Sequence, residues 1–223
     1  MTEPLGPVNA DPSIVNGRAA QTAYAEGLDA IRADSRLSDL ARAEQIEAAR
    51  RNHVEELARL QSDLDDRRRA RLSHLQAQLP NGPDIPANVS AADRAVLVTA
   101  FRGELAQARD ADQAGRLAQL ADGLRYGDDA AVRAVMSVAF DTTDMPVINA
   151  WAAATGNDAL IAEHIALRGQ LTGSDRTAVA FAEQAFRQPS KPRELANLPH
   201  LRRAAEQAAQ DAAQTARRNV HVY

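Results

Sequence analysis

The residues best suited to acid–base or metal chemistry in this chain are its histidines, and they stand far apart in the sequence. The five positions are His53, His74, His164, His200 and His221. Glu163 and His164 are neighbours, but no second histidine follows four residues on, as the helical zinc-protease pattern requires. We therefore expect His164 to be a core or half-buried residue and not a ligand or a general base.

Two pairs of aspartates offer the oxygen ligands that divalent cations prefer. One is Asp128 with Asp129, and the other is Asp141 with Asp144. Both pairs stand where helices are expected to begin, and aspartate is among the favoured residues for capping a helix N-terminus. Capping explains both pairs without a metal ion, so we expect no metal site and no cofactor.

The densest basic cluster, Arg67 to Arg69 with Arg71, could contact phosphates or nucleic acid. Three aspartates, at 63, 65 and 66, precede it at the spacing of salt bridges along a helix. No aromatic residue lies among the arginines to stack on bases. We expect a self-paired, solvated helix face, and nucleic-acid binding is the less favoured alternative.

Other catalytic classes lack their signatures. The chain has no cysteine, which excludes disulfides, thiolate catalysis and cysteine zinc sites. Phosphate-binding, dinucleotide-binding and serine-hydrolase glycine motifs are missing as well. We expect no catalytic residue. An enzyme whose site is assembled from dispersed residues around His164 remains an open alternative.

The pattern of apolar residues predicts an all-α protein. A long N-terminal helix with a coiled-coil-like stripe should precede a compact bundle of short antiparallel helices and a C-terminal helical arm. The expected segments are an extended arm over 1–16, a helix-turn-long helix over 17–79, a proline-rich linker over 80–89, a bundle domain over 90–188 and the arm over 189–223.

Within the long helix, a narrow apolar stripe passes through Val54, Leu57, Leu64 and Leu75 and is interrupted by the arginine cluster. We expect this stripe to be buried against another helix, either of the same chain or of a partner. In the bundle, the helix around Leu160 to Leu167 is apolar on more than one face and should be central, and the segment from Val179 to Phe186 should close the bundle.

The C-terminal arm is the only net-positive segment. Residues 190–223 hold six basic and three acidic residues, a net charge of +3, whereas residues 80–189 hold nine basic and fourteen acidic residues, a net of −5. The arm should therefore lie on an acidic helical domain, of its own chain or of a neighbouring copy. Its expected contact residues are Arg202, Arg203, Arg217 and Arg218.

Leu28 to Ser38 (LDAIRADSRLS), leading into Arg42 and Ile46, contains an I-x-x-D-x-x-L-S turn before a long Ala/Arg/Glu-rich helix. This stretch resembles openings of small helical virion proteins of tailed bacteriophages of actinobacteria. Residues 93–151 are similar in character to the helical domain of such proteins. The resemblance implies a role in the capsid or at the head–tail junction, with no catalytic residues.

The expected function is thus non-enzymatic: a structural or assembly protein that contacts other copies of itself or other virion proteins. A scaffold or chaperone that leaves the finished particle is the alternative. Formal net charge is −4, and a mildly acidic chain does not favour non-specific nucleic-acid binding. Without an apolar run of about 20 residues or a recognisable signal peptide, we expect no membrane contact and a location in the virion, or otherwise in the cytoplasm.

Overall fold

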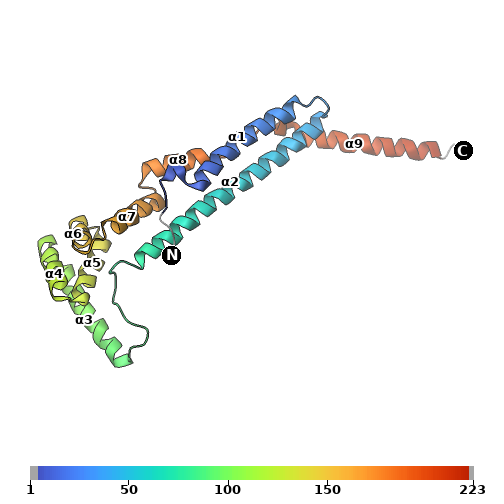
Figure 1. Ribbon diagram of the computed structural model, residues 1–223. Coiled ribbons are helices and arrows are strands. Elements are labelled where there is room, and N and C mark those ends of the chain that lie inside the picture. Colours follow the sequence, from blue (N-terminus) through green and yellow to red (C-terminus); the bar gives the residue numbers. More distant parts are fainter. Residues whose placement is uncertain (1–4, 221–223) are drawn as a thin grey trace. The chain divides into compact units, whose positions relative to one another are not determined.

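The computed structural model describes residues 5–220, except for the side chains of 216 and 218–220, and confirms the all-α fold class. No strand occurs in this range. The elements are η1 (Val8–Ala10), α1 (Pro12–Ala33), α2 (Asp39–Gln76), α3 (Ala91–Asp110), α4 (Gln113–Tyr126), α5 (Asp129–Thr142), α6 (Met145–Thr155), α7 (Asp158–Thr172), α8 (Arg176–Phe186) and α9 (Glu194–Val220) (Figure 1).

The chain divides into two compact units. We call residues 68–175 the central unit, and residues 5–67 with 176–220 the terminal unit. The first division falls inside α2, and the second falls between α7 and α8. Each unit has its own buried core.

Polar caps start the helices where the sequence indicated. Ser38 Oγ accepts a hydrogen bond from the Ala41 amide (3.2 Å) at the start of α2. Ser90 caps the start of α3, because its Oγ accepts from the Asp93 amide (3.1 Å) and its hydroxyl donates to the Asp93 carboxylate (2.7 Å). At Gly156 and Gly173, positive φ angles end α6 and α7.

The expectation of an extended arm through residue 16 is wrong. Val8–Ala10 forms a short 3-10 helix, and α1 begins at Pro12 with Asp11 as its cap, accepting from the Ser13 amide at 2.8 Å. Proline breaks a helix in its interior, but Pro12 stands at the first position of α1. There its fixed φ suits the helix, and the N–H that it lacks would have no helical hydrogen-bond partner. Ile14 consequently enters the core. Residues 1–4 of the expected arm lie outside the described residues.

In the terminal unit, α1 and α2 run side by side, and α8 packs along α1 (Figure 1). One apolar cluster joins α1, α2 and α8, and a second joins α1, α2 and the start of α9. The first comprises Ile14, Leu57, Leu60, Leu64, Ala185 and Phe186, and the second comprises Leu28, Ala43, Ile46, Leu195 and Leu198. The expectation that the segment 179–186 closes the bundle is therefore wrong, because its buried residues pack in the terminal unit.

The central unit is built around α5, and not around α7 as the sequence suggested. Buried α5 side chains include Val132, Val135, Met136 and Ala139, whereas Ile165 of α7 is largely exposed. The single tryptophan, Trp151, is buried in this core. The proline-rich linker is tied to α5, since the Gly82 amide donates to Ser137 Oγ (2.9 Å) and Arg133 pairs with Asp84 (3.0 Å).

Two glycines of α1 allow a matched test of the α1–α8 packing. A Cβ at Gly17 would lie 3.0 Å from the Ala185 carbonyl oxygen and 3.0 Å from the Phe186 ring, whereas a Cβ at Gly27 would meet nothing within 4 Å. We expect Gly17→Ala to destabilise the terminal unit by about 1–3 kcal/mol because two backbones must separate. Gly27→Ala should stabilise it by up to about 1 kcal/mol through helix propensity.

Urea unfolding followed by far-UV circular dichroism measures both changes. The account requires the two substitutions to differ in sign. Equal stability of the two variants would mean that α8 does not pack on α1 at Gly17.

Candidate protein-protein interface

The buried stripe of α2 does not stop at the arginine cluster. After Leu57, Leu60 and Leu64, the stripe positions are taken by Arg68 and Arg71, which are only 5% and 8% exposed, and then by Leu75 and Leu79. The interpretation of the cluster as a solvated face is therefore wrong for these two arginines. Arginine can occupy such positions because its aliphatic stem packs like an apolar side chain while its guanidinium reaches a partner.

The partner of Arg71 is Glu163 of α7. Arg71 Nε and Nη2 donate to the two carboxylate oxygens of Glu163 at 2.8 and 2.7 Å, which makes a bidentate pair inside the central unit. In the terminal unit, Arg67 donates to Asp11 (2.7 Å) and to Ser13 (2.9 Å) at the start of α1. These arginines thus fix α2 to other segments of its own chain.

Removing one member of the Arg71–Glu163 pair should be more harmful than removing both. We expect Arg71→Met to lower the unfolding free energy of the central unit by about 1–3 kcal/mol, since the half-buried Glu163 carboxylate loses its bidentate partner. The double variant Arg71→Met with Glu163→Met should lose clearly less unfolding free energy than Arg71→Met alone. Trp151 fluorescence during urea unfolding reports the central unit selectively, and a double variant weaker than Arg71→Met would contradict the account.

The four stripe residues expected at a partner contact have different environments. Leu57 and Leu64 are buried by Ile14, Ala185 and Phe186, so the same-chain alternative accounts for their burial without a second protein. Leu75 is buried in the part of α2 that belongs to the central unit. Only Val54 is half-exposed, at the edge of a groove described below.

The aspartate pairs have structural roles. Asp128 caps α5 by accepting from the Ala131 amide (3.1 Å), as expected. Asp144 occupies the N-cap position of α6, as expected, and its carboxylate is bound mainly by Arg116 (2.9 Å) and Gln113 (2.8 Å). Burial opposes ionisation of Asp144, yet these hydrogen bonds outweigh it and hold its pKa below the ordinary value. Among the described residues, no three His, Asp or Glu side chains converge as metal ligands would.

His164 is buried, at 4% exposure, with the edge of its ring against Phe140. Its Nδ1 has no hydrogen-bond partner. Two hollows of about 570 and 260 Å³ lie beside it, and both are also lined by Phe140 and Arg168. Burial, with a smaller contribution from the Arg168 guanidinium, holds the pKa of His164 below its ordinary value. The expected core role agrees with this environment.

A histidine with a depressed pKa makes stability depend on pH. Below the ordinary histidine pKa of about 6.5, the unfolded chain takes up a proton that folded His164 does not. The stability of the central unit should therefore fall as the pH is lowered from about 7 towards 5. This loss of unfolding free energy should be smaller in His164→Gln, whereas a substitution of the exposed His200, His200→Gln, should leave it as in wild type. Urea unfolding followed by Trp151 fluorescence at each pH measures the loss. An undiminished loss in His164→Gln would contradict this role of His164.

The C-terminal arm begins as a docked segment and ends as a free helix. Arg202 pairs with Glu44 (3.3 Å) and Glu47 (2.7 Å) of α2. The contact within the chain is thus made to α2, and not to the 80–189 segment that its negative charge suggested. Arg203 bonds only to the Pro199 carbonyl of its own helix, and Arg217 is exposed. The side chain of Arg218 lies outside the described residues.

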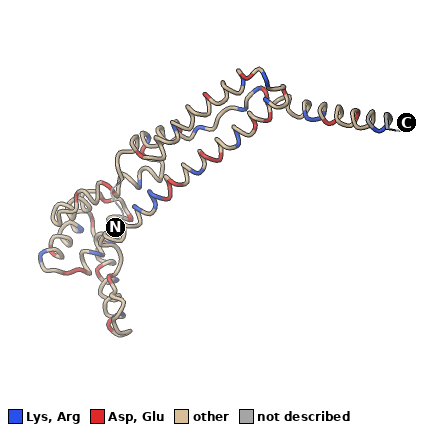
Figure 2. Tube along the Cα trace, turned by 45° about the vertical axis from the view of Figure 1, so that its right-hand side comes forward, with Lys and Arg blue, Asp and Glu red and all other residues tan. Residues whose placement is uncertain are grey.

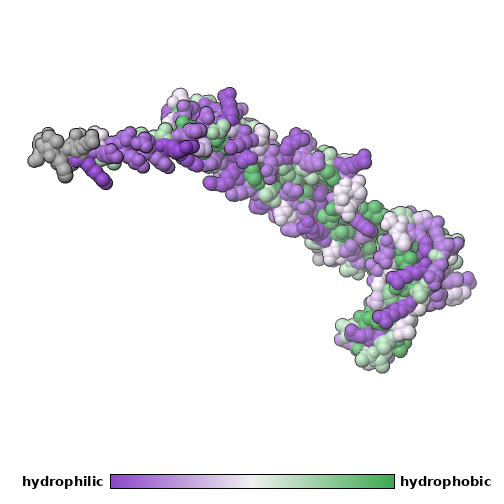
Figure 3. Space-filling model, turned by 180° about the vertical axis from the view of Figure 1, so that it is seen from behind, coloured by the Kyte–Doolittle hydropathy of each residue, from purple (hydrophilic) through white to green (hydrophobic). Residues whose placement is uncertain are grey.

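All described side chains from 202 to 217 are exposed. Figure 2 shows α9 continuing beyond the α1–α2 pair with its charges in solvent, and Figure 3 shows that this part is mostly hydrophilic. We call residues 203–220 the free half of α9.

A second exposed helix end belongs to the central unit. In the first turns of α3, residues 91–97 are all exposed, and Val96 and Leu97 are 67% and 39% accessible. In Figure 3, hydrophobic residues (green) are visible on the surface of the lower projection. We call this segment the free end of α3. An exposed pair of aliphatic residues on one helix turn is typical of a contact site.

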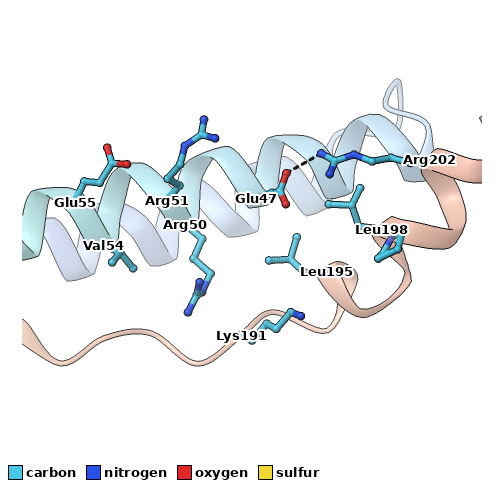
Figure 4. A pocket seen from close by; sticks show the side chains of 10 residues that line it. Glu47, Arg50, Arg51, Val54, Glu55, Lys191, Leu195, Leu198 and Arg202 are labelled. Atoms are coloured by element: carbon cyan, nitrogen blue, oxygen red, sulfur yellow. Dashed lines mark hydrogen bonds and ion pairs between the residues drawn. The ribbon is translucent and has the colours of Figure 1, made fainter.

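The terminal unit also contains a groove of about 430 Å³ between α2 and the segment that leads into α9. Its apolar side is formed by Val54, Leu195 and Leu198. Figure 4 shows the Arg50 and Lys191 side chains on the groove side of α2 and of the connecting segment, whereas Arg51 and Glu55 point away from it. We call this feature the cationic groove. The sequence alone does not reveal the cationic groove, because residues 50 and 191 are brought together only by the fold.

No protein-family model matches this chain, and searches of curated proteins and of solved structures found no significant similarity. In addition, none of the described helices has the length and apolar character needed to cross a bilayer.

Proposed function

We propose that this chain is a non-enzymatic structural or assembly protein and that the free half of α9 is its main contact element. The observation that carries the proposal is the complete exposure of the described side chains from 203 to 217 in a helix whose first turns are docked. The occupant we infer is the acidic central unit of a neighbouring copy. That unit has thirteen acidic and ten basic residues, whereas the free half of α9 has three basic and two acidic residues.

Physical arguments support a partner for this helix. About 18 residues of helix in water are marginally stable even when rich in alanine, and their stability in proteins comes mainly from packing. The alanines at 204, 208 and 212 lie along one side, and the glutamines at 210 and 214 lie on the other side. Alanine allows a close helix–helix approach but buries little area, so complementary charge must contribute to specificity.

The finer proposal is a role in a bacteriophage virion, at the capsid or at the head–tail junction, with further copies and other virion proteins as partners. It rests on the resemblance of the turn at Ile31 to Ser38 and its following long helix. Permanent retention in the particle is the primary version, and a scaffold that leaves the particle is the alternative. The protein composition of purified particles distinguishes these two versions.

Nucleic-acid binding gains no support from the arginine cluster. Arg68 and Arg71 are buried, and Arg67 is engaged with Asp11, so these three do not form a free basic surface for phosphates.

Truncation tests the proposed function. We expect removal of residues 203–223 to abolish self-association or incorporation while the fold persists, because Leu195, Leu198 and Arg202 stay in place. A longer deletion from residue 190 would also remove the side chains that cover Ile46, and it would confuse folding with assembly. Light scattering at low and high salt measures association, and the intact contact should weaken with salt.

Substitutions on the two sides of the helix provide the control. Ala208→Glu with Ala212→Glu should weaken association about ten-fold or more, since two carboxylates would be buried. Gln210→Glu with Gln214→Glu makes the same charge change on the opposite side and should have a much smaller effect. Equal association of all four proteins would exclude the free half of α9 as a contact element.

A further inference from the structure

The cationic groove and the free end of α3 have complementary chemistry. We propose that the groove of one copy receives the free end of α3 from the next copy, with Asp93 facing the groove cations and with Val96 and Leu97 on its apolar side. This inference deepens the assembly function and rests on it. It assigns a contact between the terminal unit of one copy and the central unit of another.

The groove presents positive charge without an internal counter-ion on its cations. Arg50 Nε is buried without a hydrogen-bond partner, and no ion pair to Arg50 or Lys191 is found among the described residues. Glu47, the acidic residue beside them, is already paired with Arg202 at 2.7 Å. Arg50 and Lys191 therefore leave positive charge on the groove that no described residue of their own chain neutralises, and such a surface favours an incoming carboxylate.

The groove also has an apolar side. Leu195 and Leu198 are buried in the core below it, and Val54 is half-exposed beside them. Its volume of about 430 Å³ lies in the range of pockets that enclose small organic ligands, which is ample for two aliphatic side chains. The ligand that fits is therefore a carboxylate adjacent to aliphatic groups.

The free end of α3 offers that combination on one helix side. Asp93, Val96 and Leu97 stand at positions i, i+3 and i+4, which are neighbours on a helix surface. Ser90 donates to Oδ2 of Asp93, and no hydrogen bond to Oδ1 is found within the described part of the chain. The aliphatic pair is exposed and provides the apolar anchors that interfaces bury.

The contact joins two different surfaces, and we take it as head-to-tail (heterologous) and not as a reciprocal exchange within a dimer. Each bound pair leaves one groove and one α3 end open, and further copies can add to form a ring or a filament. The base of α9 forms part of the groove, so the same pair of copies would also bring the free half of α9 to the acidic central unit of the neighbour.

Variants of the full-length chain separate the two halves of this contact. The α3 variant is Val96→Glu with Leu97→Gln, and the groove variant is Arg50→Glu with Lys191→Glu. Matched controls are Tyr126→Glu, an exposed aromatic residue of α4, and Arg59→Glu with Arg187→Glu, which makes the same charge change at exposed positions of the terminal unit that do not line the groove. Sedimentation velocity across a concentration series gives the mass of each protein, and far-UV circular dichroism confirms that each is folded.

Because the groove contact and the α9 contact join the same two copies, we expect neither to suffice alone. Wild type and both controls should therefore grow in mass with concentration, and the α3 and groove variants should each remain single chains. An equimolar mixture of these two variants should form two-chain complexes and nothing larger, because one intact groove meets one intact α3 end. Wild-type assembly by either variant, or a mixture that stays monomeric, would overturn the proposal. If the α3 and groove variants assemble normally while truncation after Arg202 abolishes assembly, this contact is wrong and the proposed function stands.

Discussion

The stripe along α2 is the constraint on which the rest of the structure depends. An isolated helix of 38 residues with a charged surface gains little from propensity, so its stability comes from packing of this one stripe. In the terminal unit the stripe is covered by α1 and α8, and beyond residue 67 it continues in the central unit with Arg68 and Arg71 in place of leucines. The Arg71–Glu163 pair is what allows a charged residue to occupy a buried position there.

Because the chain covers this stripe itself, the surfaces left for other proteins lie elsewhere. They are the free half of α9, the free end of α3 and the cationic groove. The free half of α9 gains almost no stabilisation from burial against its own chain. The first turns of α9, by contrast, are held by Leu195, Leu198 and the Arg202 ion pairs. A docked base with an exposed continuation is the arrangement expected of an assembly arm, and it supports contact as the function.

Local signals in the sequence predicted local structure well. Ser38, Ser90, Asp128 and the glycine stops identified helix ends, because capping depends on residues a few positions apart. The assignments that failed concern which helix packs on which. The apolar residues of α8 do not by themselves identify the core that they join. The surface that α8 covers includes Ile14, in a segment interpreted as extended, together with Gly17 and the leucines of α2. Likewise, arginines at stripe positions look solvated until the position of Glu163 is known, and net charge could not identify α2 as the partner of Arg202.

We expect the free half of α9 to be unsupported in the single chain and to be stabilised by a partner copy. Amide hydrogen exchange resolved along the chain measures this directly, in dilute protein and in the assembled state. The account predicts fast exchange over 203–220 in dilute protein, strong protection of the buried part of α2 in both states, and clear slowing over 203–220 on assembly. Exchange over 203–220 that is equally fast, or equally slow, in both states would contradict it.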